Sequence, residues 1–522
     1  MKVVPVPELL SLVYQYLLKN ANRISFVLVA GCFLTVLILR IYLIFGYQSE
    51  LGGVESNVIY TILRGVAGYD IYSNPEKPPF SITQYSPLYY YATIGICKVL
   101  QITSDQVHEV YVVSRSFSLL CNLIFAAICY WILGGVFRIK GILRWLAGIF
   151  SFAYLEVESF SRPDSLYNLF VLLTIWIFLS FLQNKEKREG LYFFVVAASF
   201  SIVTLFVKQS GIYLPLILLF YILFFLPSWK HFLLAALVMA TTGGLLLWIT
   251  AGDGLSIFFQ NVIGGVNNGI SYNWWVKRML INHLQRENIF DILGLFLGLW
   301  YLVNTKIHEH RFLGLCALTM FLFANVTGIK IGSAPNYFTE FLATTFILIS
   351  IFVHQNKGFV QQIPKIRNHC PLLLLLTFIF TLGLRTLFLV HTYPKFSFIT
   401  YQTYLANQEV ANFLKEDGLA ADDLVFTTTH RYDFLNKLLF RNCAFPQKEI
   451  VVVNPSGVFD YAAFYETIQS GKLKYFIMRQ DGLYEEPGVD ENFLGVDFSS
   501  FQLVGVLQGY SIYKNPRSSK VE

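Results

Sequence analysis

Long apolar runs follow one another through most of this chain, and many of them approach the ~20 residues that a helix needs to cross a bilayer. Hydrophobic residues make up 55% of the 522 positions and charged residues only 14%, which is too apolar for a soluble protein. The sequence therefore predicts an α-helical polytopic membrane protein. The formal net charge of +6 is small for this length and does not indicate nucleic-acid binding.

About eleven runs are predicted to span the membrane. They are the segments 24–45, 110–135, 145–160, 165–182, 191–207, 212–226, 231–251, 289–303, 312–328, 338–354 and 370–391. The run 85–100 is shorter and is interpreted as a juxtamembrane helix. With that choice the basic loops, such as 138–144 and 185–188, all lie on one side, which the positive-inside rule assigns to the cytoplasm. The N-terminus is then inside and the C-terminus outside.

The domain organisation follows from the same pattern. Residues 1–23 are expected to form a cytoplasmic interfacial helix, 24–391 a transmembrane catalytic domain, and 47–109 its first extracytoplasmic loop, with juxtamembrane helices. From 392 to 522 polar residues dominate, and a small extracytoplasmic α/β domain is expected. Its predicted strands are Leu424–Thr427, Glu449–Val453, Tyr475–Met478 and Val504–Tyr513, and its predicted helices are 402–416 and 460–470. The scattered cysteines have no paired spacing and are expected to be packing residues.

Polar residues gather where predicted spans reach the outer face. Glu55 follows the first span, at a place where a carboxylate could act as a base on a lipid-borne substrate or could be a solvated loop acid. Arg162, Pro163 and Asp164 form a second outer turn, where Asp164 suits either catalysis or the first turn of a helix. For both carboxylates the sequence therefore allows a structural role as well as a catalytic one.

Two further clusters contain groups that suit a phosphate and a sugar. Lys208 and Gln209 end a span, where an ammonium either binds an anion such as a lipid phosphate or snorkels. Asn336 and Glu340 are four residues apart and would share one helix face, although Asn336 could also serve as a cap. The loop 252–288 is rich in aromatic, amide and basic side chains, which suit sugar and phosphate or an interfacial belt.

The order of several short motifs resembles bacterial GT-C glycosyltransferases. The motifs are Glu55, Gly68-Tyr69-Asp70-Ile71-Tyr72, Tyr85-Ser86-Pro87-Leu88-Tyr89-Tyr90, Ser114-Arg115, Arg162-Pro163-Asp164-Ser165-Leu166, Lys208-Gln209-Ser210-Gly211 and Pro335-Asn336-Tyr337-Phe338. The resemblance covers roughly residues 24–355 and is greatest to the family-39-like group related to protein mannosyltransferases and the lipid A aminoarabinose transferase. It implies an enzyme of the bacterial inner membrane that transfers a sugar from a polyprenyl-phosphate donor to an acceptor hydroxyl at the extracytoplasmic face.

The resemblance also implies roles for individual residues. Glu55 falls at the position of a candidate general base, although Val54 precedes it where the pattern has a second acidic residue, and Asp164 falls at a second acidic position. The residues expected to bind the donor phosphate are Lys208, Gln209, Arg115 and Arg278. The residues expected to bind substrate are Tyr85, Arg162, Asn273, Trp274, Asn336, Tyr337 and Glu340.

The expected chemistry is a single displacement that inverts the anomeric centre. Glu55 and Asp164 could also bridge a divalent cation, Mg²⁺ or Mn²⁺, so that metal use stays open. The acceptor could be a lipid, a glycan or a protein, and membrane lipids are further partners. A non-catalytic membrane scaffold or a transporter for envelope assembly is the alternative, although a transport path would require its polar groups at mid-membrane depth.

Overall fold

The computed structural model describes a helical bundle with a small sheet at one end. It describes residues 26–520 except for the segments 52–53, 159, 252–253, 356–379, 385, 388–389, 392–396, 428–433, 448–456 and 480–498. The predicted interfacial helix at 1–23, the predicted strand Glu449–Val453 and most of the predicted span 370–391 lie outside the described residues.

Within the described residues, 7 helices are long and apolar enough to cross a membrane. They are Phe26–Ile44, α4 with its π-helical end η1 (Val107–Trp131 and Ile132–Val136), α6 (Pro163–Asn184), α7 (Arg188–Val207), α9 (Trp229–Ala251), α13 (His308–Gly328) and η5 with α14 (Pro335–Phe338 and Thr339–Gln355). Two shorter helices, α5 (Ile142–Glu158) and α8 (Tyr213–Phe225), pack among them. So does α12 (Asn282–Asn304), whose apolar part is Ile289–Asn304. Every span predicted between 110 and 354 coincides with one of these helices, so the predicted polytopic helical fold is confirmed.

Burial distinguishes the centre of the bundle from its periphery. All side chains of α14 from Thr339 to Ile351 are buried, and this helix packs against α5, α12 and α13. The helix α9 is the opposite case, with Leu237 62% exposed and Trp248 74% exposed. An apolar helix whose outer face has no protein partner is suited to lipid.

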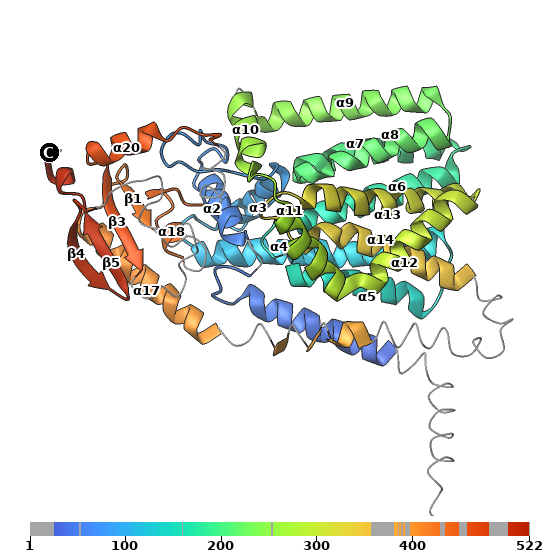
Figure 1. Ribbon diagram of the computed structural model, residues 1–522, viewed down its shortest axis with the longest axis horizontal. Helices are drawn as coiled ribbons and strands as arrows, with labels where there is room; N and C mark the ends of the chain where they lie inside the picture. The colour runs from blue at the N-terminus through green and yellow to red at the C-terminus, as the bar shows by residue number, and fades with distance from the viewer. Residues whose placement is uncertain are drawn as a thin grey trace, which may run out of the picture.

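The first loop contains two short helices, α2 (Glu55–Val66) and α3 (Leu88–Val99). At 12 residues, α3 is about 18 Å long, well below the ~30 Å of a bilayer core, as expected for a helix that does not cross. A second loop contains α10 (Leu255–Val262), η3 (Gly264–Val266), α11 (Tyr272–Trp274) and η4 (Trp275–Ile281). Figure 1 shows α2, α3 and α10 between the bundle and the sheet.

The C-terminal part is an α/β layer. It contains α17 (Ser397–Glu416), β1 (Leu424–Thr427), α18 (Leu435–Leu438), β2 (Cys443–Ala444), α20 (Ala462–Gln469), β3 (Leu473–Arg479), β4 (Gln502–Leu507), β5 (Tyr510–Lys514) and η9 (Pro516–Lys520). The sheet order is β2-β1-β3-β5-β4, with β1 parallel to β2 and β3 and the other pairs antiparallel. The prediction of one strand over Val504–Tyr513 is wrong, because Gln508 and Gly509 both have positive φ and turn the chain into a hairpin.

The first loop and the C-terminal domain share one hydrophobic core. The ring of Phe80 stacks on that of Phe445 with centroids 5.0 Å apart, and both contact Phe464 of α20. The backbone N–H of Phe445 donates to the carbonyl of Pro79 over 2.9 Å. The C-terminal domain is therefore packed onto the loop that leads to Tyr85.

Candidate active site

Most of the predicted site residues belong to two neighbouring clusters. One surrounds Glu55 at the start of α2, and the other surrounds Asp164 at the start of α6. The turn before α6 belongs to both, because the backbone N–H of Ser161 donates to Glu55 Oε1 over 3.3 Å. The structure thus brings the two predicted carboxylates to adjacent positions, each with its own partners.

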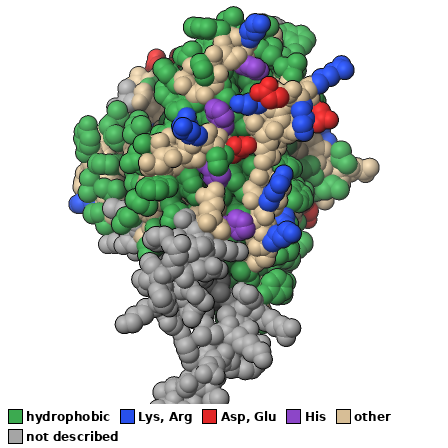
Figure 2. Space-filling model, turned by 90° about the vertical axis from the view of Figure 1, so that its right-hand side faces the viewer, with side chains coloured by type: hydrophobic (Ala, Val, Ile, Leu, Met, Phe, Trp, Pro, Cys, Tyr) green, Lys and Arg blue, Asp and Glu red, His purple; other side chains and the backbone are tan. Residues whose placement is uncertain are grey.

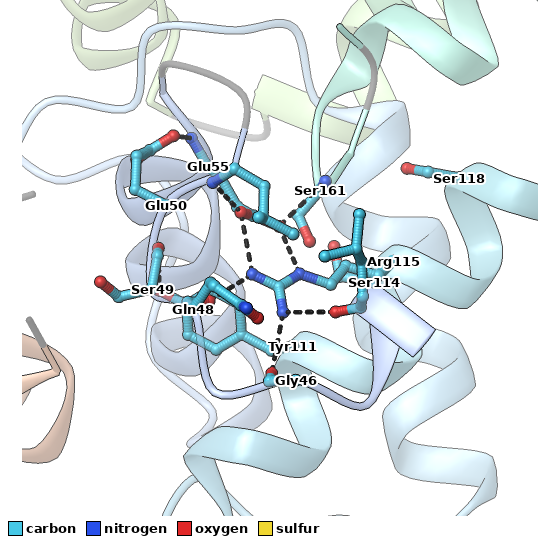
Figure 3. A network of polar contacts seen from close by, with 12 residues as sticks. Gly46, Gln48, Ser49, Glu50, Glu55, Tyr111, Ser114, Arg115, Ser118 and Ser161 are labelled. Carbon is cyan, nitrogen blue, oxygen red and sulfur yellow. Dashed lines mark hydrogen bonds and ion pairs between the residues drawn. The ribbon is translucent and has the colours of Figure 1, made fainter. Parts of the chain in front are cut away.

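Glu55 is completely buried and is held by Arg115 of α4 (Figure 3). Arg115 Nε donates to Oε1 over 2.7 Å, and Nη2 donates to Oε2 over 3.0 Å. The backbone N–H of Leu51 donates to Oε2 over 2.9 Å. With the Ser161 contact, each oxygen of this carboxylate accepts two hydrogen bonds. Burial opposes ionisation, but Arg115 and these donors hold the pKa of Glu55 below its ordinary value.

Arg115 uses all its donors within the protein. Besides Glu55, its guanidinium donates to the carbonyls of Leu43, Gly46 and Gln48, at the end of the first helix. A guanidinium has five N–H groups, and the hydrogen bonds to these carbonyls and to Glu55 occupy them all. In this structure its side chain joins the first helix, α2 and α4, and the role predicted for Arg115 at the donor phosphate stays a prediction.

Asp164 lies in the first turn of α6 and is 2% exposed. Lys208 Nζ donates to its Oδ1 over 2.8 Å, and Asn336 Nδ2 donates to the same oxygen over 2.7 Å. Arg162 Nε forms an ion pair with Oδ2 at 3.2 Å. Four predicted residues from three separate parts of the chain thus meet at one carboxylate.

Aromatic rings surround the ammonium of Lys208. Its Nζ lies 4.8 Å from the ring centroid of Tyr337 and 5.5 Å from that of Tyr167. Burial opposes the charge, but Asp164 raises the pKa of Lys208 above its ordinary value, so the side chain is an ammonium. Tyr85 completes this environment: burial raises the pKa of its phenol to about 12 against the opposing effect of Arg162, so it stays protonated.

Several buried acceptors in this cluster make no hydrogen bond within the described part of the chain. They are Asn336 Oδ1, the hydroxyl of Ser161 and Asp164 Oδ2, whose contact with Arg162 is an ion pair. Buried acceptors without donors are costly unless a ligand or water supplies the hydrogen. Sugar hydroxyls are donors of the required kind, and the arrangement suits a polyhydroxylated ligand beside two cations.

Gln209 contacts the backbone of both loops. Its amide nitrogen donates to the carbonyl of Gln84 and, over 2.8 Å, to that of Val262. Both amide hydrogens are occupied by these carbonyls, and the role predicted for Gln209 at the donor phosphate stays a prediction. The side chain fastens the first and second loops beside Lys208.

The residues predicted from the second loop are Asn273, Trp274 and Arg278. Trp274 Nε1 donates to the carbonyl of Ser333 over 3.0 Å and so fastens α11 to the segment before η5. Asn273 is exposed on the same turn. The side chain of Arg278 lies outside the described part of the structure.

Glu340 lines a small cavity with Tyr167, Ser210, Tyr213, Tyr337 and Lys208. The volume of ≈ 10 Å³ is about that of one water molecule. Sequence reasoning missed Tyr167 and the buried Asn168, which lie three and four residues after Asp164 on the same helix face. Polar side chains at that spacing within an apolar span were the available signal.

The two carboxylates do not fit the predicted divalent cation. Lys208, Arg162 and Asn336 already surround Asp164, and Arg115 with backbone N–H groups surrounds Glu55. Within the described residues no three His, Cys, Asp or Glu side chains are grouped as metal ligands. The prediction of a Mg²⁺ or Mn²⁺ site at Glu55 and Asp164 is therefore not supported by the donor set.

No family model and no curated protein matches the sequence. Among solved structures, ArnT from Cupriavidus metallidurans in the apo state matches at 13% identity and a TM-score of 0.59, over 94% of this chain and 98% of that one. The same protein bound to undecaprenyl phosphate matches at a TM-score of 0.57, with the same identity and coverage. The Archaeoglobus fulgidus oligosaccharyltransferase matches at 12% identity and a TM-score of 0.54, over 88% of this chain and 70% of that one.

This chain has the GT-C fold. The archaeal neighbour has also been solved, under the name AglB, with an inhibitory peptide and dolichol-phosphate, and in complex with Zn and sulfate. At such low identities the likeness concerns the fold. Within that fold, the Asp164 cluster is the polar centre on which a functional proposal must rest.

Proposed function

We propose that the protein is a membrane glycosyltransferase that takes a sugar from a polyprenyl-phosphate donor and transfers it to an acceptor hydroxyl. The observation that carries the proposal is the buried group of Asp164, Lys208, Arg162 and Asn336, which combines two cations with hydrogen-bond acceptors. The fold neighbours support the donor class, since they were solved with undecaprenyl phosphate and dolichol-phosphate.

The donor phosphate would bind at Lys208 and Arg162. In the structure Asp164 neutralises both cations, so an incoming phosphate competes with this carboxylate for them. Transfer of the cations to the phosphate leaves Asp164 with fewer stabilising partners and makes it a stronger base. Donor binding would therefore prepare the carboxylate for chemistry.

In the proposed reaction the acceptor oxygen attacks the anomeric carbon as the bond to the phosphate oxygen breaks. The acceptor proton passes to Asp164 Oδ2, which has the ion pair with Arg162 but makes no hydrogen bond to any residue that the structure describes. Lys208 and Arg162 stabilise the charge that develops on the departing polyprenyl phosphate. A single displacement of this kind inverts the anomeric centre. Glu55 would act as an anchor in place of the expected base, because its oxygens are fully used.

The site is proposed to face the extracytoplasmic side of a bacterial inner membrane, with a lipid, glycan or protein as acceptor. Basic residues cluster at the end of the bundle away from the sheet, which the positive-inside rule places in the cytoplasm. Single cysteines introduced at Lys140 and Ser470, which are both exposed, test this orientation. An impermeant maleimide applied to whole spheroplasts should label only Ser470→Cys.

The decisive experiment compares the wild type with Asp164→Asn, using purified protein and radiolabelled polyprenyl-phosphate sugars. Loss of the base should lower kcat by about 10²–10⁴-fold while the protein still binds the polyprenyl phosphate. Asp422→Asn changes an exposed carboxylate of the C-terminal domain and serves as the matched control. No turnover by the wild type with any donor would contradict the proposal and favour a scaffold.

A further inference from the structure

A second cavity opens at the end of the bundle opposite to the sheet. Its volume is ≈ 190 Å³, and it lies between η1, the end of α6, the beginning of α13 and the end of α14. Figure 2 looks onto this end and shows histidine and basic side chains gathered there. The polar lining residues are Arg138, Gln183, Glu309, His310, His354 and Gln355.

His310 provides a buried donor to this cavity. Its ring is 6% exposed and stacks on Tyr301 with centroids 5.3 Å apart. The hydroxyl of Tyr301 donates to Gln355 Oε1 over 3.0 Å, which directs the Gln355 amide nitrogen to His310 Nε2 at 2.8 Å. Because that amide nitrogen is a donor, Nε2 accepts, and the hydrogen of the neutral ring is on Nδ1.

The Nδ1–H group has no acceptor among the described residues. A buried donor without a partner is unfavourable, and in a polar cavity a ligand oxygen or water relieves that cost. Tyr301 and Gln355 fix the tautomer, so the donor is built into the site. The side chain is therefore arranged to bind an oxygen acceptor.

The charges around the cavity favour an anion. Arg138 contributes a guanidinium from the turn after η1, where its φ of 55° reverses the chain. Lys140, Lys185 and Arg311 lie in the segments that surround the opening, and Lys185 and Arg311 both act electrostatically on the neighbouring His308. Glu309 is the acidic side chain of the lining and opposes an anion.

We propose that this cavity binds a phosphate group, either on a lipid headgroup or free in solution. Arg138 would hold the charge as a rim cation, and His310 Nδ1 would donate to a phosphate oxygen. Charge-assisted hydrogen bonds of this kind suit a phosphate at headgroup depth, where the ends of spanning helices meet the interface. The inference is independent of the glycosyl transfer proposed above, since it concerns the opposite end of the bundle.

Binding is measured on the full-length purified protein in two arms. In the first, nanodiscs of phosphatidylcholine contain increasing phosphatidylglycerol, and native mass spectrometry counts the retained anionic lipid. In the second, inorganic phosphate is titrated into detergent-solubilised protein and followed by ³¹P NMR. If the anionic lipid is retained and inorganic phosphate does not displace it, the bound phosphate group belongs to a lipid headgroup. Saturable phosphate binding without lipid retention identifies free phosphate.

Variants locate the binding. Arg138→Ala and His310→Ala should each weaken it about tenfold, and Glu309→Gln should strengthen it because a like charge is removed. Arg138 is exposed and Glu309 half-buried, so these variants keep the test usable if His310→Ala does not fold. Lys187 is an exposed basic residue at the same end of the bundle, and Lys187→Ala is the control for non-specific electrostatic attraction of the phosphate. Absence of binding in both arms, or equal binding by Arg138→Ala and the wild type, would overturn the proposal.

Discussion

The ammonium of Lys208 lies 2.8 Å from Oδ1 of Asp164, and both side chains are buried. The contact joins the start of α6 to the junction of α7 and η2. A buried ammonium requires an anionic partner, and Asp164 supplies it within the protein. The carboxylate thus occupies the place at the cation that a donor phosphate would take under the proposed function.

This contact predicts strong coupling between the two side chains. Lys208→Met should lower the stability of the protein by about 3–5 kcal/mol, because Asp164 then keeps Arg162 as its one charged partner among the described residues. The double variant with Asp164→Asn should lose less than the sum of the single losses. The free energy of unfolding, measured by denaturant titration in mixed micelles, checks the cycle. Additive losses would show that the pair is not coupled.

Chelation provides a second prediction. The cations next to Asp164 are Lys208 and Arg162, and the carboxylate has no arrangement of further acidic or histidine ligands within the described residues. Transferase activity should therefore persist after dialysis against EDTA, within about twofold of the untreated enzyme. Activity that disappears with EDTA and returns with Mg²⁺ or Mn²⁺ would contradict this prediction.

Much of the bundle was predictable because hydropathy alone determines where a chain can cross a bilayer. The residues around Asp164 were also predictable as a group, since Arg162, Lys208 and Asn336 stand at the ends of predicted spans. Polar groups at such positions are few in an apolar chain. When the spans pack together, the polar groups at their ends are therefore expected to contact one another.

The partners of Arg115 and Gln209 were not predictable in the same way. Both side chains donate to backbone carbonyls, including those of Leu43 and Val262, and any residue carries a carbonyl. Such contacts depend on how the loops fold over the helix ends. The residue types alone do not predict that arrangement. Motif order therefore located these residues near the site but could not predict their hydrogen-bond partners.

The stability of the protein should depend on pH through Glu55. Its pKa is lowered on folding, so its contribution is fully present above the unfolded pKa of about 4.3 and is lost as pH falls through the folded value. Glu55→Gln lacks this contribution and leaves Arg115 without its anion. The difference in Tm between wild type and variant should be large at pH 7 and shrink below about pH 5.

The control for this prediction is Glu466→Gln, which changes an exposed carboxylate on α20. Its Tm should follow that of the wild type at every pH. Activity per folded molecule gives an independent reading, because an anchoring Glu55 predicts that folded Glu55→Gln retains measurable transfer. A constant Tm difference across the pH range would show that Glu55 is not the ionised anchor described above.

The C-terminal domain should influence the site through Gln447. This buried side chain accepts a hydrogen bond from the backbone N–H of Ile82 over 3.1 Å. Two residues later, the carbonyl of Gln84 accepts from Gln209, which is adjacent to Lys208. A continuous set of contacts therefore runs from the C-terminal domain to the proposed phosphate site.

Gln447→Ala should lower stability by about 1–3 kcal/mol, because the Ile82 N–H is left buried without an acceptor. The loosened loop should also raise the KM for the donor several-fold, since the Gln84 carbonyl that accepts from Gln209, next to Lys208, would be less firmly positioned. Gln402→Ala, at an exposed position of α17, is the matched control and should change neither quantity. If Gln447→Ala is destabilised but keeps the wild-type KM and kcat, the domain stabilises the loop without positioning the site.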